Sequence, residues 1–281
     1  LNQISHIKSI YFSFNSNLFY LNLSHNMINF IDFKSFVHDR LIKLDLSFNK
    51  IKFLTDDHFF RIKSLEAIYE TSVLELRLNQ NSVNKIEVCL KHMKILDMSF
   101  NSLNSYNIHF KCNKFYSIAV IDFSHNQIKV LRNEISDSFF LKMKCSYLNL
   151  SMNEIDLIEH EAFRQIGKDL LRLDLSYNKL GKNSYINKIK WLSSLVYLDQ
   201  LNLKHNFLEY LNVNLFEDLF FLQELYLSNN RFIFIDSVWF VRLQNLRLLD
   251  ISQNQFLMQI INRKEFEKFS GKKKNLISLF E

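Results

Sequence analysis

The sequence contains no proline and only three glycines among 281 residues. Proline and glycine form most tight turns and flexible linkers, so their scarcity excludes a linker of that kind and leaves no punctuation between domains. Asn, Asp and Ser must therefore build the turns. We expect residues 1–281 to form a single array rather than separate domains.

Long apolar runs are also missing, because no stretch reaches about 18 consecutive apolar residues, the length of a transmembrane helix. With only Gly167, Gly181 and Gly271 available, the chain has no Gly-rich phosphate loop, and no nucleophile elbow or pair of catalytic carboxylates is present. These absences argue against an enzyme, and we expect no cofactor and no bound metal. The net charge of +6 is spread along the chain apart from a basic run at Arg263, Lys264, Lys268 and 272–274. Such a run is typical of a solvated loop, which disfavours nucleic acid as a partner.

A repeated pattern fills the whole chain. In residues 222–240, Leu222, Leu225, Leu227, Asn230 and Phe232 fit the pattern LxxLxLxxNxL of a leucine-rich repeat. The pattern recurs every 20 to 32 residues, which gives about eleven repeats. Its asparagine stands at Asn2, Asn26, Asn49, Asn81, Asn101, Asn126, Asn153, Asn178, Asn206, Asn230 and Asn254.

The pattern predicts an α/β fold, a leucine-rich repeat solenoid shaped like a horseshoe. The LxxLxL part should be a strand of a concave parallel sheet, with alternate leucines pointing inward. The motif asparagines should form a structural ladder, because an inward amide satisfies backbone groups that the turn leaves unpaired. Ten positions after the Asn, a second column predicts a Phe-lined convex side of loops and short helical turns: Phe12, Phe36, Phe59, Phe163, Phe216 and Phe240.

The array has irregular places and incomplete ends. Repeats from Asn81 to Asn126 and the repeat at Asn178 lack the Phe, and residues 68–71 and 185–194 are the expected insertions, which either carry binding or reflect drift in a tolerant loop. The first repeat has only its second half, and the final Leu276 and Leu279 fit only the opening of another. We therefore expect a longer array that is truncated inside a repeat at both ends.

The segments LDLSFNKI (44–51), LNLSMNEI (148–155) and LDLSYNKL (173–180) resemble the typical 24-residue class of animal extracellular leucine-rich repeats. The chain is similar over its whole length to the ectodomains of Toll and Toll-like receptors and to the adhesion protein chaoptin. The resemblance implies recognition of a protein partner at the cell surface, by a receptor ectodomain or an adhesion molecule. The cysteine-rich caps usual beside such repeats are absent.

Candidate binding residues lie at the outward positions of the concave sheet. The residue between the two leucines of the LxL motif is an aspartate in five of the repeats. Such a column of aspartates suits either a basic partner or a solvated face. Tyr and Arg at these positions are residue types enriched in binding hot spots. The candidate partner-binding residues are Tyr20, Lys43, Asp45, Arg77, Asp97, Asp122, Tyr147, Arg172, Asp174, Glu224, Tyr226 and Asp250.

Two glycosylation sequons, Asn22-Leu23-Ser24 and Asn149-Leu150-Ser151, fall inside the LNLS form of the repeat. They are either true acceptors or by-products of the repeat consensus. In a secreted chain, glycans there would project from the concave face and direct ligands to other surfaces.

The cysteines leave three alternatives open. Cys145 stands at a leucine position and is most simply a core residue. Cys89 and Cys112 hold equivalent places in adjacent repeats and form a possible disulfide. Together with His92 and His109 they also offer zinc ligand types, although their spacing is loose.

Three histidines, His25, His125 and His205, stand directly before motif asparagines. Protonation near pH 6 would change their charge, so they form a possible pH-sensitive edge.

The sequence thus favours an extracellular or cell-surface recognition module, anchored to a membrane only through segments outside this chain. An intracellular scaffold or regulatory subunit in the cytoplasm is the alternative. The sequence does not fix the ligand or the oligomeric state.

Overall fold

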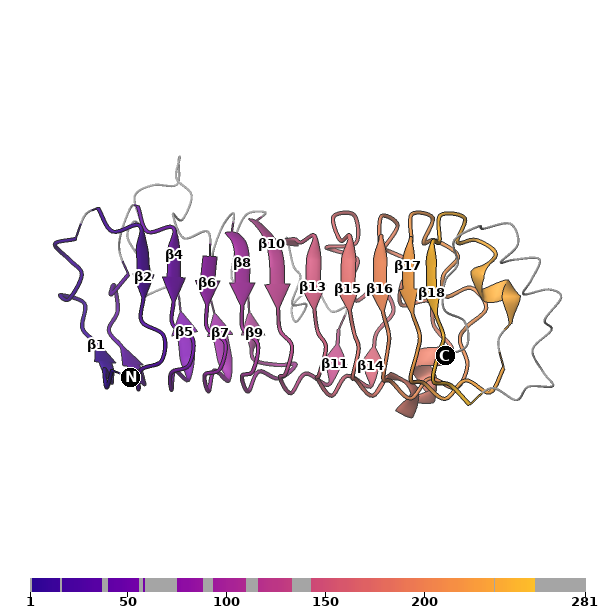
Figure 1. Ribbon diagram of the computed structural model, residues 1–281, viewed down its shortest axis with the longest axis horizontal. Helices are drawn as coiled ribbons and strands as arrows, with labels where there is room; N and C mark the ends of the chain where they lie inside the picture. Colours follow the sequence, from indigo (N-terminus) through magenta and orange to yellow (C-terminus); the bar gives the residue numbers. More distant parts are fainter. Residues whose placement is uncertain are drawn as a thin grey trace. The chain divides into compact units, whose positions relative to one another are not determined.

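The computed structural model describes residues 2–15, 17–36, 40–55, 58, 75–87, 93–109, 116–132, 143–234 and 236–255. The chain forms two compact units. Unit 1 comprises Leu1–Gln127 and Phe139–Cys145, and unit 2 comprises Ile128–Ser138 and Ser146–Glu281. Each unit is a stack of coils in which successive repeats lie side by side (Figure 1).

The main sheet of unit 1 is parallel and follows the order of the repeats, β2-β4-β6-β8-β10, with β12 paired to β10. Its leucines align in register, so that Leu21, Leu44, Leu76 and Leu96 are neighbours across the strands. The strands are β2 (Tyr20–Asn22), β4 (Lys43–Asp45), β6 (Glu75–Arg77), β8 (Met93–Asp97), β10 (Tyr116–Asp122) and β12 (Met143–Lys144).

Shorter parallel strands form a second layer on another side of the same coils. In unit 1, β1 (His6–Ile7) pairs with β3 (Phe30–Ile31), and β5 (Phe53–Thr55), β7 (Lys85–Glu87) and β9 (Ile108–His109) form a three-stranded sheet. The equivalent pair in unit 2 is β11 (Val130–Leu131) with β14 (Leu157–Ile158).

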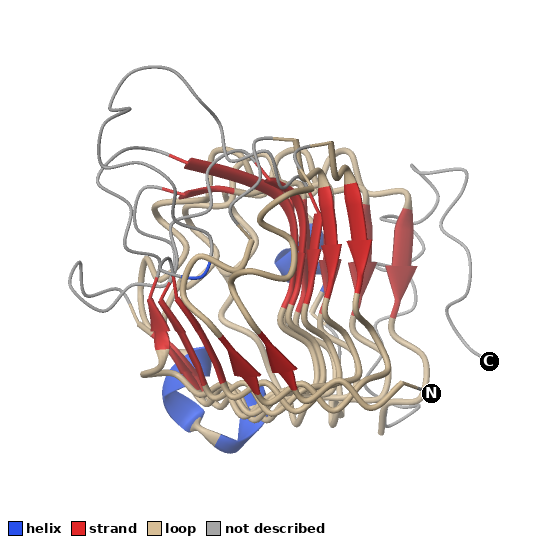
Figure 2. Ribbon diagram, turned by 90° about the vertical axis from the view of Figure 1, so that its left-hand side faces the viewer, coloured by secondary structure: helices blue, strands red, loops and turns tan. Residues whose placement is uncertain are grey.

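Unit 2 repeats the arrangement with a parallel main sheet in the order β13-β15-β16-β17-β18. These strands are β13 (Tyr147–Asn149), β15 (Arg172–Asp174), β16 (Gln200–Asn202), β17 (Glu224–Tyr226) and β18 (Leu248–Asp250). Unit 2 also contains the short 3-10 turns η2 (Leu180–Lys182), η3 (Ser184–Asn187) and η4 (Ser237–Phe240). Strands and loops make up most of what Figure 2 draws in colour.

The repeat leucines build the core of each unit. The central leucine of most main strands, such as Leu44, Leu148 and Leu201, is fully buried, and both residues that flank it face outward. Full burial of one such side chain contributes about 2 kcal/mol. The expected leucine-rich repeat solenoid with a parallel sheet is confirmed, whereas the single array of about eleven repeats stays a prediction.

The phenylalanine column lies where the sequence places it. Phe36, Phe163, Phe216 and Phe240 are buried, and the last two rings stack with centroids 6.3 Å apart. Phe12 is half-buried. Phe59 and the expected insertion at 68–71 lie outside the described residues.

The insertion expected at 185–194 contributes to the core instead of only bulging outward. Ile186, Trp191 and Leu192 are buried there, and the Trp191 ring lies 6.5 Å from that of Phe163. Trp191 therefore fills space in the repeat that lacks the usual phenylalanine.

Candidate binding surfaces

The motif asparagines connect consecutive repeats through their amides. In unit 1, the Oδ1 atom of Asn49 accepts the backbone N–H of Ile28 in the preceding repeat at 2.9 Å. Its Nδ2 donates to the carbonyls of Leu23 in the preceding repeat and of Leu46 in its own. Each buried amide thus satisfies backbone groups that neither strand nor helix would satisfy.

The same three-way bonding recurs in both units. It is made by Asn81, Asn101, Asn126, Asn178, Asn206, Asn230 and Asn254. Asn26 and Asn153 accept an N–H from the preceding repeat in the same way, and Asn2 is exposed.

The residue before each motif Asn, from His25 to Gln253, has a left-handed backbone with φ between 51° and 56°. This conformation costs a non-glycine residue about 1 kcal/mol, and the ladder bonds that follow it hold it in place. We call this column of residues the turn edge.

The turn edge carries exposed aromatic rings. In unit 1, His25 stacks on Phe48 and His125 on Phe100, with centroid distances of 4.1 and 3.8 Å. In unit 2, His205 stacks on Tyr177 at 4.0 Å. The three histidines of the possible pH-sensitive edge therefore lie in separate aromatic stacks, one ring to each histidine.

The aspartates inside the LxL motifs point outward but are bonded locally. Asp45 Oδ1 accepts the backbone N–H and the hydroxyl of Ser47, at 3.0 and 2.6 Å. Asp97, Asp174 and Asp250 bond the serine two residues on in the same way, and Asp122 accepts the N–H of Ser124. Asn22 and Asn149 make the equivalent bond to Ser24 and Ser151. These carboxylates and amides therefore first stabilise the turn after each strand.

The outward face of the main sheet, which we call the sheet face, has two columns in register. In unit 1, Asn22, Asp45, Arg77, Asp97 and Asp122 are successive neighbours, beside a column that begins with Tyr20, Lys43 and Glu75. Tyr20 is 67% exposed. Lys43 and Glu75 form an ion pair at 3.1 Å that contributes at most about 1 kcal/mol, because it is partly exposed.

On the sheet face of unit 2, one column holds Asn149, Asp174, Asn202, Tyr226 and Asp250. The other column holds Tyr147, Arg172, Gln200, Glu224 and Leu248. The structure therefore places all twelve candidate partner-binding residues on the sheet faces of the two units.

A charged cluster lies at the β18 end of this face. The Lys204 ammonium contacts the Asp250 carboxylate at 2.7 Å, and the Ser228 hydroxyl donates to the same carboxylate. Burial by itself raises the pKa of Asp250, but hydrogen bonds from Lys204, Ser252 and Ser228 outweigh it and lower the pKa to about 2. Asp250 therefore stays ionised in any physiological compartment.

Tyr226 lies next to this cluster. Its hydroxyl donates to the Glu224 carboxylate at 2.8 Å, and the Lys204 ammonium lies 4.7 Å from its ring centroid. Burial and the bond to Glu224 raise the pKa of Tyr226 to about 12, so the phenol remains a hydrogen-bond donor.

Sequence reasoning missed Glu75, Gln200 and Lys204 as members of the sheet face. The first two occupy the same repeat position as Lys43 and Arg172, so the register already identified them. Lys204 is two residues after Asn202, where most other repeats have serine. Its contact with Asp250 reaches from the end of β16 past β17 to β18, and no pattern within one repeat predicts it.

Of the three cysteines, Cys145 lies within the described residues. Cys145 is buried, as a core residue would be, and its sulfur contacts the Ala119 carbonyl at 4.0 Å. Cys89, Cys112 and His92 lie outside the described residues, so the disulfide and the zinc site are untested. Within the described ranges there is no cluster of three or more metal-ligating side chains, and no helix is long and apolar enough to cross a bilayer.

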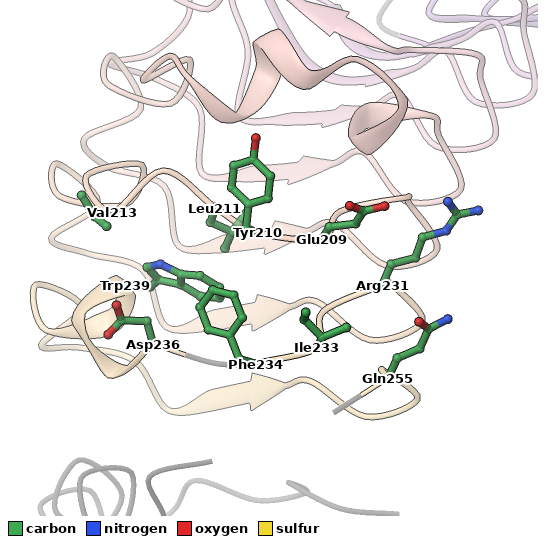
Figure 3. A pocket seen from close by; sticks show the side chains of 10 residues that line it. All are labelled: Glu209, Tyr210, Leu211, Val213, Arg231, Ile233, Phe234, Asp236, Trp239 and Gln255. Carbon is green, nitrogen blue, oxygen red and sulfur yellow. The ribbon is translucent and has the colours of Figure 1, made fainter. Parts of the chain in front are cut away.

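Unit 2 also has two adjoining hollows outside the sheet face. The edge groove, of about 580 Å³, follows the turn edge and includes Met152, Tyr177, His205, Asn229 and Gln253. The side pocket, of about 630 Å³, lies among Tyr210, Leu211, Ile233, Phe234 and Trp239 (Figure 3). Arg231 and Gln255 line both hollows.

The repeats, their ladder and their sheet agree with comparisons to known proteins. A family model described as "Leucine rich repeat" matches residues 220–271. The chain is 29% identical to osteomodulin from Bos taurus, over 80% of this chain and 52% of that protein. It is 28% identical to Toll-like receptor 3 from Boselaphus tragocamelus, over 85% of this chain and 27% of that receptor.

Among solved structures, the functional domain of InlJ from Listeria monocytogenes superimposes with a TM-score of 0.55 and 19% identity. The match covers 90% of this chain and 52% of that one, and it supports the fold alone. The chain is therefore a leucine-rich repeat protein that resembles Toll-like receptor ectodomains. It spans about half of osteomodulin and a smaller share of the receptor.

Proposed function

We propose that the chain is an extracellular protein-recognition module of a receptor or adhesion protein, without enzymatic activity, and that it binds a protein partner through the sheet face. The similarity to Toll-like receptor 3 and osteomodulin supports a recognition module of this class. The intracellular alternative has no comparable support from these relatives.

One observation carries the choice of surface: the sheet face is outward-facing and varied, while the leucines beneath it are uniform. On β15 to β17, Arg172, Gln200, Glu224 and Tyr226 lie on adjacent strands, and we call them the β15–β17 patch. Tyr and Arg at the centre of such a patch are the residue types that carry most binding energy in protein interfaces. The turn-bonded aspartates beside them supply charge for orienting the partner.

The first experiment tests the compartment. The chain is expressed with a signal peptide in animal cells, and glycan occupancy at Asn22 and Asn149 is measured by peptide mass spectrometry, with N22Q and N149Q as matched controls. We expect glycan on at least one of these asparagines in folded, secreted protein. Retention of the folded chain inside the cell without glycan would contradict the extracellular role.

The second experiment tests the surface. The secreted chain, displayed as a multimer, is screened against a panel of extracellular domains, and each protein that binds is measured again with variants. We expect R172A and Y226A to weaken binding at least about tenfold, as hot-spot residues do. R164A is the control, because Arg164 is exposed and, among the described residues, its ion-pair partner is Glu161 of the same loop. Binding that tolerates both patch variants would exclude the sheet face of unit 2.

A further inference from the structure

The two hollows of unit 2 share lining residues and form one continuous surface. This surface includes none of the residues of the β15–β17 patch. Each of five consecutive repeats contributes one turn-edge residue to the edge groove, from Met152 to Gln253. At about 4.8 Å per strand these five residues span about 19 Å, the length of roughly six extended peptide residues. The side pocket opens beside this groove at Arg231 and Gln255.

The edge groove is basic. Its lining includes Lys179, His205 and Arg231 and no carboxylate. Lys179 contacts the Glu154 carboxylate at 3.0 Å, and Lys129 contacts the same carboxylate at 3.7 Å.

Phe207, which also lines the edge groove, brings two more cations together. The Lys182 ammonium and the Arg231 guanidinium each lie 4.6 Å from its ring centroid. In the part of the chain that the structure describes, neither cation has a salt-bridge partner. Two like charges held on one ring repel each other, and an anionic ligand would relieve that repulsion.

The side pocket by contrast is lined mostly by apolar and aromatic side chains. Leu211 and Trp239 are almost fully buried at its base, while Tyr210 and Ile233 are exposed at its rim. In Figure 3, the side chains of Ile233, Phe234 and Trp239 lie between Arg231 on one side and Asp236 on the other. Two carboxylates line this pocket, Glu209 and Asp236, and Asp236 is used to cap η4 through the N–H of Val238.

We propose that this surface binds an extended acidic segment of a protein partner, with carboxylates in the edge groove and one large apolar side chain in the side pocket. Clusters of cationic side chains recognise acidic motifs in this way. The exposed amides of Gln253 and Gln255 can pair with a peptide backbone, which offers both donors and acceptors, whereas a phosphodiester backbone offers only acceptors. The proposal rests on the proposed function only in that the occupant is a protein.

The test uses synthetic peptides and the whole folded chain, so it does not depend on finding the natural partner. The probe is a fluorescent hexapeptide of five alternating glutamates and aspartates followed by one phenylalanine. One control peptide has alanine in place of the phenylalanine, and another has lysine in place of every acidic residue. Fluorescence anisotropy measures the affinity of each peptide at low and at physiological salt.

Matched variants divide the surface into its two parts. R231Q and K182Q remove charge beside Phe207, and I233D places a carboxylate at the rim of the side pocket. R242Q removes one exposed positive charge of unit 2 that lines neither hollow. R172A lies in the β15–β17 patch and serves as a second control. Thermal unfolding of each variant shows that it is folded.

We expect the acidic peptide with phenylalanine to bind at least about tenfold more tightly than either control peptide, and more weakly as salt rises. R231Q, K182Q and I233D should each lower its affinity by about fivefold or more, while R242Q and R172A leave it unchanged. Equal losses for R242Q and R231Q would mean nonspecific charge attraction and overturn the proposal. Equal affinity for the peptides with phenylalanine and with alanine would also overturn the proposal. Tighter binding of a single-stranded oligonucleotide of equal charge would do the same.

The outcomes separate the two proposals. One outcome is that R231Q loses the peptide but still binds the panel partner. This result supports peptide binding by the edge groove and side pocket, whatever the role of the β15–β17 patch. The opposite outcome is that R172A loses the panel partner and the unaltered chain does not bind the peptide. This result overturns the proposal for the edge groove and side pocket and supports the proposal for the sheet face.

Discussion

At the scale of single residues, the two glycines that the structure describes, Gly167 and Gly181, stand at places of close backbone approach. A Cβ atom on Gly181 would lie 1.7 Å from the Phe207 carbonyl oxygen, and one on Gly167 would lie 2.2 Å from that of Ser194. The left-handed turn edge, where glycine would relieve strain, uses other residues throughout. Glycine is thus retained where a side chain has no space, and the ladder bonds hold the left-handed turns.

The asparagine ladder gives a direct prediction at this scale. Replacing Asn178 by leucine removes a buried amide that bonds the N–H of Ile155 and the carbonyls of Leu150 and Leu175. Since each buried group left unpaired costs about 1 to 3 kcal/mol, we expect the free energy of unfolding to fall by about 3 kcal/mol or more. Urea unfolding followed by circular dichroism measures this change.

The matched control for this substitution is Q165A, at an exposed position of the same unit. We expect it to change stability by less than about 0.5 kcal/mol. A similar unfolding midpoint for both variants would show that the amide bonds contribute little beyond the packing of the strands.

At the scale of elements, the sheet face shows how side chains from separate strands act together. Lys204 follows β16, Tyr226 lies in β17 and Asp250 lies in β18, and the parallel register brings the three into contact. Because these contacts involve ionised groups, the stability of this part of the sheet depends on pH.

The Asp250 carboxylate gives the corresponding prediction. Its pKa in the folded chain is about 2, below the usual value of 3.8 that it regains on unfolding. The unfolded chain therefore binds the proton more tightly, and the stability that Asp250 contributes is present above about pH 4 and is lost as the pH falls toward 2. We expect this contribution to be on the order of 1 to 2 kcal/mol, since the ion pair is partly exposed to solvent.

The measurement compares thermal unfolding of the natural chain and D250N at several pH values between 2 and 7. D250N should be less stable at pH 7 and nearly equal at pH 2, so the difference between the two should shrink as the pH falls. Q165A, at an exposed position of unit 2, removes no ionisable group and should give a difference that does not change with pH. An unchanging difference for D250N would contradict the lowered pKa.

At the scale of the whole molecule, repeats that contact mainly their neighbours make stability a property of local groups of coils. Leu201 in β16 is fully buried between Leu173 of β15 and Leu225 of β17. L201A should cost about 2 to 5 kcal/mol, because it leaves a cavity in a packed core. The loss should spread outward from β16 and weaken with each repeat.

Hydrogen exchange followed by mass spectrometry measures that spread. We expect protection to fall most in β15, β16 and β17 and less in β13. L171A is the control, because Leu171 is 47% exposed and its loss should leave exchange almost unchanged. A uniform loss of protection across all strands of unit 2 would show that it unfolds as one cooperative body.

The sequence by itself determined the strands and the turns that follow them, because the same pattern of leucine and asparagine recurs in every repeat. The first leucine of each LxL motif points inward, and the residues on either side of it point outward, as Lys43 and Asp45 do around Leu44. Each motif Asn marks the turn that follows. The period of two in a strand fixes which residues face outward, so all twelve candidate residues on the sheet face followed from spacing alone.

Only the tertiary structure decided which side chains meet between repeats. The contact of Lys204 with Asp250, the cations on Phe207 and the burial of Trp191 beside Phe163 join residues 24 or more apart in sequence. They also depend on rotamers that no motif specifies. The structure also decided the local bond between Asp45 and Ser47, because outward spacing does not show whether a carboxylate is already hydrogen-bonded. The repeat sets positions along the chain, whereas contacts depend on the distance between coils and the directions of individual side chains.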